Sequence, residues 1–300
     1  MKKKLWIVIV IFTIANITLI NNVYGQQNEK EKATQLNDRQ FDEVVNKMHI
    51  IPGLWRPMFE NEQVAWISPH WESQEYVWFD FPEAIQIDGE FIYLGHLSKR
   101  FRTAFPTEKW APWVIGENGI SYEQVLPNGV SFSGEITEKE ENVAALTLNI
   151  TNGSSKELKE VMLLTCIYLD GVKEFNDKTN DNKYVHTPCK GWVPLTKTEE
   201  CPAVEEGVNV GWLKEGNNNS VSDLPVIVVK SKKEERLIAT TWFDDTYTFI
   251  GNPIHPCVHA DPIFKNLKPG DSQTITGELI FFEGTIDEFE VWFRDRLKNK

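Results

Sequence analysis

The sequence predicts a mainly β protein, a large antiparallel β-sandwich with short helices at its two ends. Short apolar segments alternate with turns rich in Gly, Pro and Asn over most of the chain, which is typical of a sheet protein. In residues 143–150, Leu146, Leu148 and Ile150 are separated by polar residues, so one face of that strand is buried and the other faces water. Because no linker or break in composition interrupts the middle of the chain, we expect residues 37–300 to form one domain.

The first 25 residues predict a bacterial-type secretory signal peptide. Three lysines at positions 2–4 precede an apolar run over 5–20, and small or tolerated residues at 23–25 allow cleavage before Gln26. The run is shorter than the roughly 20 residues that a spanning helix needs. We therefore expect an exported chain, periplasmic or secreted and not inserted in a membrane; a retained anchor is the alternative.

Residues 26–36 are polar and predict a flexible tether. Asn37 or Asp38 can then cap a short helix. Its apolar face carries four residues at helical spacing: Phe41, Val44, Val45 and Met48.

The strands follow in order between turn signals. Asp88-Gly89 before residues 90–94 predicts a hairpin. Residues 158–169 are more continuously apolar, as in a central strand covered on both faces. Further strands are expected at 208–212, 226–230, 237–243 and 272–282, with surface turns at 217–219, 232–235 and 269–271.

The chain is expected to close with a helix over residues 285–298. Thr285 and Glu288 have the spacing of a capping box. Phe289, Trp292, Phe293 and Leu297 then fall on one stripe of that helix. The stripe predicts that the helix packs against the sandwich.

The charge balance limits the partners. The chain has 31 basic and 44 acidic residues, a formal net charge of −13. Nucleic acid and anionic membranes would be repelled, whereas an anionic oligosaccharide can still bind in a local cationic pocket. The common hydrolase, nucleotide and metalloprotease motifs do not occur in the sequence.

Four cysteines in an oxidising compartment can pair in three ways. Cys189 and Cys201 flank a loop punctuated by proline and form the favoured disulfide. Cys166 lies in an apolar run and is expected to be a small buried hydrophobe.

The densest polar cluster is His255-Pro256-Cys257-Val258-His259-Ala260-Asp261-Pro262. Prolines at both ends predict a shaped loop. His255, His259 and Asp261 could hold a divalent metal with one position open to substrate. Histidines that bind or act on a substrate without a metal are an alternative, as is a structural loop; no cofactor is required.

Tyr184 and His186 form a second cluster. On a strand they project from the same face, roughly 7 Å apart, and a phenol and an imidazole can divide general acid and general base work. Packing at a strand end is the alternative interpretation.

Two further groups could bind substrate. Arg100 and Arg102 share a face if their segment is extended, and guanidinium groups match carboxylate or sulfate. His70 and Trp71 belong to a segment rich in tryptophan, and exposed rings suit the apolar faces of sugars. A solvated strand edge and a buried core are the respective alternatives.

The segments at 184–187, 191–195, 255–262 and 267–270, followed by a strand at 277–284, resemble secreted proteins of polysaccharide-utilisation loci in marine Bacteroidetes. Among these are the lyase-related dehydratases of ulvan oligosaccharides. The rhythm of strands and turns is also similar to the supersandwich of galactose-mutarotase-like domains, although the catalytic pattern of the epimerases is not evident.

The resemblance implies β-elimination on uronate-containing oligosaccharides. A base removes the proton beside the carboxylate, positive charge or a metal stabilises the enolate, and an acid protonates the departing oxygen. His186 or His259 would be the base, Tyr184 the acid, and Arg100 or Arg102 the carboxylate clamp. The leaving group can be water or a sugar. A non-catalytic glycan-binding protein and a structural surface protein are the alternatives, and the oligomeric state stays open.

Overall fold

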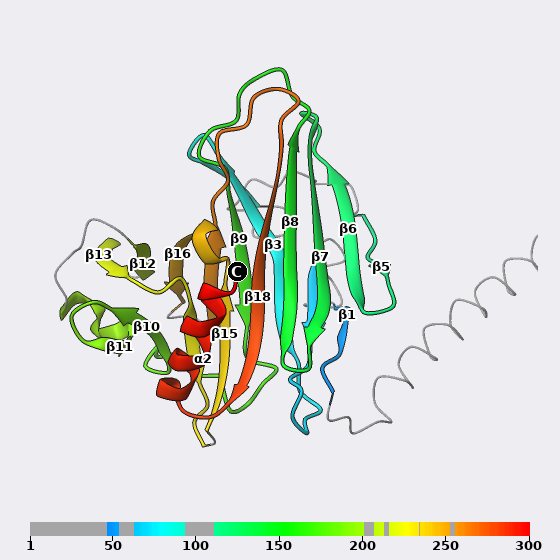
Figure 1. Cartoon of the computed structure of the whole chain (residues 1–300). Coiled ribbons are helices and arrows are strands. Elements are labelled where there is room, and N and C mark those ends of the chain that lie inside the picture. Colours follow the sequence, from blue (N-terminus) through cyan, green and yellow to red (C-terminus); the bar gives the residue numbers. More distant parts are fainter. Residues whose placement is uncertain are drawn as a thin grey trace, which may run out of the picture. The chain divides into compact units, whose positions relative to one another are not determined.

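The computed structural model describes residues 47–53, 63–93, 111–200, 207–212, 216–233, 235–252 and 256–300. The predicted signal peptide, the tether and most of the predicted first helix lie outside them. Within the described residues the chain forms two sheets of nine strands each (Figure 1). The predicted mainly β, two-sheet class is confirmed.

The first sheet, sheet A, has the strand order β1-β2-β3-β9-β17-β16-β12-β13, and β4 pairs with β3. Its pairs are antiparallel except for the parallel pair of β12 and β16. The strands are β1 (Ile50–Pro52), β2 (Val64–Ile67), β3 (Val77–Ile87), β4 (Glu90–Tyr93), β9 (Met162–Tyr168), β12 (Val208–Trp212), β13 (Gly216–Ser222), β16 (Thr246–Gly251) and β17 (Cys257–Pro262).

The second sheet, sheet B, has the order β11-β10-β14-β15-β18-β8-β7-β6-β5 and is antiparallel throughout these pairs. The strands are β5 (Val114–Ile115), β6 (Gly119–Val125), β7 (Val130–Glu140), β8 (Val143–Asn152), β10 (Lys183–Thr187), β11 (Gly191–Pro194), β14 (Ile227–Lys230), β15 (Arg236–Thr241) and β18 (Ser272–Glu283). Two short 3-10 turns, η1 (Leu195–Glu200) and η2 (Phe243–Asp245), interrupt the strand sequence.

The main core lies between the two sheets. Side chains alternate along each strand, so the inner faces place every second residue in one cluster. Phe79 and Phe81 of β3 contribute from sheet A, and Leu146 and Leu148 of β8 from sheet B. Burying these faces against each other orients the remaining side chains of each strand away from the core.

Several local predictions are confirmed. The Asp88-Gly89 turn joins β3 to β4, and both residues have positive φ, 51° and 79°, as a type I′ hairpin turn requires. The central strand predicted around residue 165 is β9, in which only the last residue is partly exposed.

Two local predictions are wrong. Residues 217–219, expected as a surface turn, lie within β13 at the edge of sheet A, because backbone pairing with β12 overrides the low strand propensity of Asn. Residues 257–262, expected as a loop between prolines, form β17. Pro262 occupies the last position of that strand, opposite a register shift in β16, where a missing N–H is tolerated.

One helix, α2 (Ile286–Lys298), covers part of the outer face of sheet B (Figure 1). Thr285 and Glu288 form the predicted capping box. Phe289 and Phe293 enter a second cluster with β14, β15 and β18 residues, while Trp292 packs against it. Among the described residues, no helix has the length and hydropathy needed to cross a membrane.

Lys183 is a fully buried cation on the inner face of β10. Its Nζ donates hydrogen bonds to Asn180 Oδ1 at 2.5 Å and to the Asp177 carbonyl oxygen at 3.2 Å. Burial lowers the pKa of Lys183 from its ordinary 10.5 to about 8, and the Cys257 thiol and Asp177 offset part of this shift. The folded state therefore holds this proton less firmly than the unfolded chain does.

We predict that the free energy of unfolding rises with pH between about 8 and about 10, because there the unfolded state binds the extra proton. Over this pH range the titration of Lys183 should raise the free energy of unfolding by about 3 kcal/mol in total. Urea unfolding of Lys183→Met should show a flatter pH dependence, while Lys173→Met, whose side chain is 87% exposed, should retain the native slope. Equal slopes in all three proteins would contradict the assignment.

Candidate functional site: the outer face of sheet A

A row of aromatic side chains crosses the outer face of sheet A. Trp66 of β2 pairs with Trp78 of β3, and Trp78 pairs with Tyr168 of β9. The ring centroids are 6.5 Å apart in the first pair and 5.5 Å in the second. All three residues are partly exposed, and their neighbours Phe79 and Ile167 lie in the core. The row therefore faces away from sheet B.

A polar row runs directly beside the aromatic one. Asp80 of β3 pairs with Cys166 of β9, and Cys166 pairs with His259 of β17. The three residues are only 8%, 6% and 6% exposed. The two rows are two residues apart along β3 and β9, so the buried polar row lies directly beside the partly exposed aromatic row.

The strand β17 adds two more groups to this face. Cys257, His259 and Asp261 are alternate residues of the strand, and the intervening Val258 and Ala260 lie in the core. Cys257 Sγ lies 3.7 Å from His259 Nε2, and His259 Nδ1 lies 3.5 Å from Asp261 Oδ1. The backbone N–H of Thr165 donates a 2.8 Å hydrogen bond to that same Oδ1.

Opposing effects act on the protonation of the buried pair His259 and Asp261. Burial lowers the pKa of His259, but the Asp261 carboxylate and the Cys257 thiol outweigh it and raise the pKa well above its ordinary value. Burial also raises the pKa of Asp261, against the effects of His259 and the Thr165 N–H. We place the proton on His259, because Asp261 already accepts the Thr165 N–H and that bond favours the charged carboxylate.

A protonated imidazole cannot accept another proton. In this form His259 suits an acid or a source of positive charge, which differs from the role of base predicted for it. At 3.5 Å the contact with Asp261 is an ion pair, and among the described residues none hydrogen-bonds His259 Nδ1 or Asp261 Oδ2. Buried polar atoms without a hydrogen-bond partner are unusual in folded proteins.

The predicted metal ligands are only partly described. His255 lies outside the described residues, while His259 and Asp261 share one face of β17. The ligand atoms of Cys166, Cys257 and His259 lie within 4.8 Å of one another. Thiolates and imidazole are the donors that zinc prefers, so the donor set that the fold brings together includes both thiols.

Tyr184 and His186 share one face of β10, as predicted. His186 Nδ1 lies 2.5 Å from Asp223 Oδ1, and its Nε2 lies 3.6 Å from Glu290 of α2. Tyr184 packs against the cluster beneath α2, and Lys230 lies over its ring. Both residues therefore belong to the outer face of sheet B.

The candidate catalytic residues thus form two separate groups. Val258 points into the shared core, so the next residue, His259, faces outward from sheet A. Val185 also points into this core, so Tyr184 and His186 on either side of it face outward from sheet B. One substrate cannot contact both groups. Arg100 and Arg102 lie outside the described residues.

His70 and Trp71, the residues proposed to bind sugar rings, lie on neither of these outer faces. Trp71 is 5% exposed and packs edge-on against Phe281 in the main core, with the Arg236 guanidinium over its ring. His70 contacts Trp71 and lies 3.6 Å from Glu283. Burial lowers the pKa of His70, and Glu283 offsets part of this shift. The ring of Trp71 is not exposed to a ligand in this structure.

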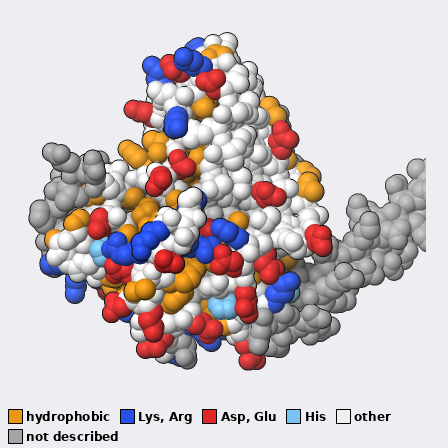
Figure 2. Space-filling model, in the orientation of Figure 1, with side chains coloured by type: hydrophobic (Ala, Val, Ile, Leu, Met, Phe, Trp, Pro, Cys, Tyr) orange, Lys and Arg blue, Asp and Glu red, His pale blue; other side chains and the backbone are white. Residues whose placement is uncertain are grey.

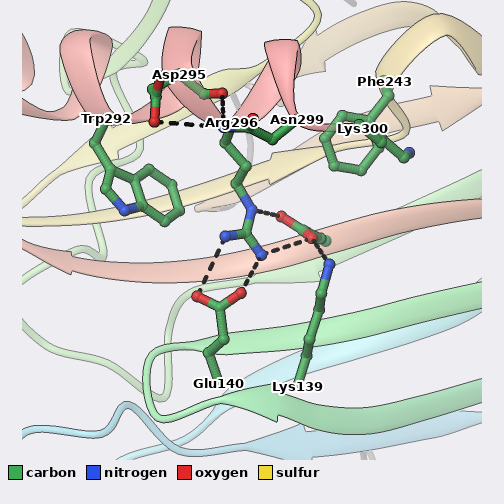
Figure 3. Close-up of a pocket in the computed structure, with 9 residues that line it drawn as sticks. Lys139, Glu140, Phe243, Trp292, Asp295, Arg296, Asn299 and Lys300 are labelled. Atoms are coloured by element: carbon green, nitrogen blue, oxygen red, sulfur yellow. Dashed lines mark hydrogen bonds and ion pairs between the residues drawn. The ribbon is translucent and has the colours of Figure 1, made fainter.

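A hollow of about 360 Å³ lies beside the C-terminal half of α2 (Figure 3). Its centre is Arg296, which binds Glu140 and Glu278 together, and Lys139 also contacts Glu278. On the face around α2, acidic and basic side chains are interspersed (Figure 2). Because its central cation is already neutralised by two carboxylates, the hollow is a poor match for an anionic sugar.

The cysteines divide into two groups. Cys189 is disulfide-bonded, and Cys201, its predicted partner, lies outside the described residues. Cys166 and Cys257 are buried and are not in a disulfide. The sequence interpretation of Cys166 as a small buried hydrophobe accounts for its burial but omits the second thiol and the imidazole beside it.

Sequence reasoning missed Asp80, Tyr168 and the pairing of Cys166 with His259. One signal was available. Cys257, His259 and Asp261 recur with a period of two, which is the period of a strand face. The pairing register between strands that are far apart in the chain cannot be predicted from a pattern of this kind in one sequence.

Comparisons with known proteins give likeness in structure only. No family model and no curated protein matches the sequence. Similar solved structures include a galactose mutarotase related enzyme from Lactobacillus acidophilus, 10% identical with a TM-score of 0.41 over 79% of this chain and 98% of that one. A putative aldose 1-epimerase from Escherichia coli K12 is 10% identical with a TM-score of 0.40, over 79% and 99%.

A heparan sulfate lyase from Pedobacter heparinus is also similar, with 7% identity and a TM-score of 0.35 over 80% of this chain and 36% of that one. These neighbours are carbohydrate-processing enzymes by their names. All three TM-scores are below 0.5, so none of these likenesses assigns a residue, a substrate or a reaction to this chain.

Asp261 should contribute to stability through its hydrogen bond with Thr165. Asp261→Ala leaves a buried N–H without its acceptor and should lower the free energy of unfolding by about 1–3 kcal/mol. Asp261→Asn retains an oxygen acceptor and should cost less. Urea unfolding of the two variants checks this order, and an equal loss in both would show that the hydrogen bond contributes little.

Proposed function

We propose that the protein binds a uronate-containing oligosaccharide across the outer face of sheet A and catalyses β-elimination there. The observation that carries the proposal is the register of sheet A. It aligns partly exposed aromatic rings beside a row of buried carboxylate, thiol and imidazole groups. One surface thereby combines the means to hold a sugar with the means to move a proton.

The aromatic row supports the binding step. Indole and phenol rings present flat apolar faces that match the C–H faces of sugar rings. Trp66 and Trp78 are stacked with an interplanar angle of 29°, and Tyr168 follows at 31° to Trp78. Three partly exposed rings with similar tilt suit an extended saccharide chain better than a compact ligand.

The polar row supports the chemical step. Elimination begins with loss of the proton on the carbon that bears the carboxylate, and the resulting enolate needs positive charge nearby. In our assignment Asp80 is the base, and Tyr168 is the acid that protonates the departing oxygen. The charge comes from the His259 end of the row, as an imidazolium or as a cation bound there. Both water and a sugar fit as the leaving group.

The substrate class rests on charge and on the sequence resemblance. The chain is acidic, with a net charge of −13, so an anionic sugar requires a local cation rather than a general attraction. Arg100 and Arg102 keep the proposed role of carboxylate clamp. Because the sequence resembles dehydratases of ulvan oligosaccharides, we take ulvan fragments as the proposed substrate. The protein would act on them after export from the cytoplasm.

The decisive test is the formation of a new double bond. The purified protein, incubated with ulvan, alginate and glucuronan oligomers, should generate the absorbance of an unsaturated uronate with at least one of them. Mass spectrometry then identifies the leaving group, because dehydration removes one water without shortening the chain. Binding with no change in absorbance or mass would instead support the non-catalytic glycan-binding alternative.

Paired variants locate the chemistry. Asp80→Asn should lower kcat by at least about 100-fold, whereas Asp223→Asn, which disturbs the His186 pair on sheet B, should change it little. Trp78→Ala should raise KM by about tenfold, and Trp292→Ala on α2 should leave KM unchanged. If Asp223→Asn and His186→Ala abolish activity while Asp80→Asn does not, the reaction takes place on sheet B.

A further inference from the structure

We propose that Cys166, Cys257 and His259 bind one zinc ion on the outer face of sheet A. The two thiolates and one imidazole would occupy three positions of a tetrahedral site, and the fourth would be open to water or a substrate oxygen. Within the described part of the chain, this is the one group of three His, Cys, Asp or Glu side chains with ligand atoms close enough to share an ion. The site does not depend on the substrate proposed above.

The spacing of the donor atoms fits such an ion. Zinc–sulfur bonds of about 2.3 Å and zinc–nitrogen bonds of about 2.0–2.1 Å place tetrahedral sulfur and nitrogen ligands roughly 3.5–3.7 Å apart. Cys257 Sγ lies 3.7 Å from His259 Nε2, and all three donor atoms are within 4.8 Å of one another. Small side-chain rotations bring them to one ion without moving the strands.

The backbone explains why the donors meet. Cys166 of β9 and His259 of β17 are directly paired across adjacent antiparallel strands, and Cys257 lies two residues before His259 on the same face. Three ligands on two hydrogen-bonded strands are fixed by the sheet rather than by a loop. A site on rigid strands is already organised for its ion.

The surroundings of His259 match those of a metal-bound imidazole. Its Nε2 faces the thiol of Cys257, and its Nδ1 faces the Asp261 carboxylate at 3.5 Å. Thr165 fixes that carboxylate through its backbone N–H. Histidines that bind zinc usually direct the second ring nitrogen to a carboxylate or carbonyl, which orients the ring. Asp261 is then an orienting group rather than a ligand.

Two other uses of these residues are less consistent with the geometry. A cysteine nucleophile activated by His259 and Asp261 would use Cys257 alone, and the second thiol beside the same imidazole would have no role. Cys166 and Cys257 do not form a disulfide, since both are present as thiols in the structure. Two buried thiols beside one imidazole are instead the donor set of a Cys2His zinc site with an open position.

The test measures metal in the purified full chain. After exposure to zinc and dialysis against metal-free buffer, we expect about one zinc per chain by elemental analysis. Cobalt(II) in place of zinc should give intense near-ultraviolet bands from thiolate-to-metal charge transfer. Cys166→Ser and His259→Gln should each reduce retained zinc at least about tenfold, whereas His49→Gln, a histidine outside the cluster, should retain it.

A second measurement on the unmutated protein covers the case in which a variant fails to fold. Zinc should raise the midpoint of urea unfolding of the reduced protein, and a strong chelator should return it to the metal-free value, because an ion bound only by the folded state stabilises it. Absence of both retained zinc and cobalt bands in the reduced native protein would overturn the proposal. A Cys166–Cys257 disulfide identified by mass spectrometry in the protein as isolated would also overturn it. Neither result bears on whether uronates are substrates.

Discussion

Packing between the two sheets fixes which residues of each strand face inward, and the two-residue period of the β-strand then determines where the candidate groups on β3, β9, β10 and β17 point. Phe79, Ile167 and Val258 enter the core from three adjacent strands. Their neighbours Asp80, Cys166 and His259 must then face outward from sheet A and lie in one row. The apolar residues cannot leave the core without a large loss of hydrophobic stabilisation, so the polar row is held by packing on the opposite side of the sheet.

The outer faces of the two sheets carry different kinds of side-chain clusters. On sheet B, α2 covers a second apolar cluster, and Arg296 ties the helix to Glu140 of β7 and Glu278 of β18. Glu278 is 2% exposed, so removing Arg296 would leave a buried carboxylate with much less compensation. This ion-pair group is explained by its structural role. The polar row of sheet A is also nearly fully buried, but it combines carboxylate, thiol and imidazole groups rather than a guanidinium with two carboxylates.

The sequence predicts what local patterns determine. The Asp88-Gly89 hairpin and the Thr285 capping box need only a few neighbouring residues, and both were predicted correctly. The prediction failed at β17, where prolines at both ends of Cys257–Pro262 indicated a loop, because the pairing of β17 with β9 and β16 is not visible locally. The same limit applies to the site. Tyr184 and His186 do share a face, but whether His259 joins them depends on which sheet each strand enters.

The composition of the polar row argues that it serves more than the fold. A strand at the position of β17 needs only Val, Ile or Leu on a buried outer face, as the neighbouring β9 shows with Leu164. Cys257, His259 and Asp261 instead bring groups whose desolvation costs several kcal/mol unless each is fully partnered. The orphaned His259 Nδ1 and Asp261 Oδ2 indicate that partnering within the described residues is incomplete. A cation bound by Cys166, Cys257 and His259 would use three of these groups as ligands and would offset part of their desolvation cost.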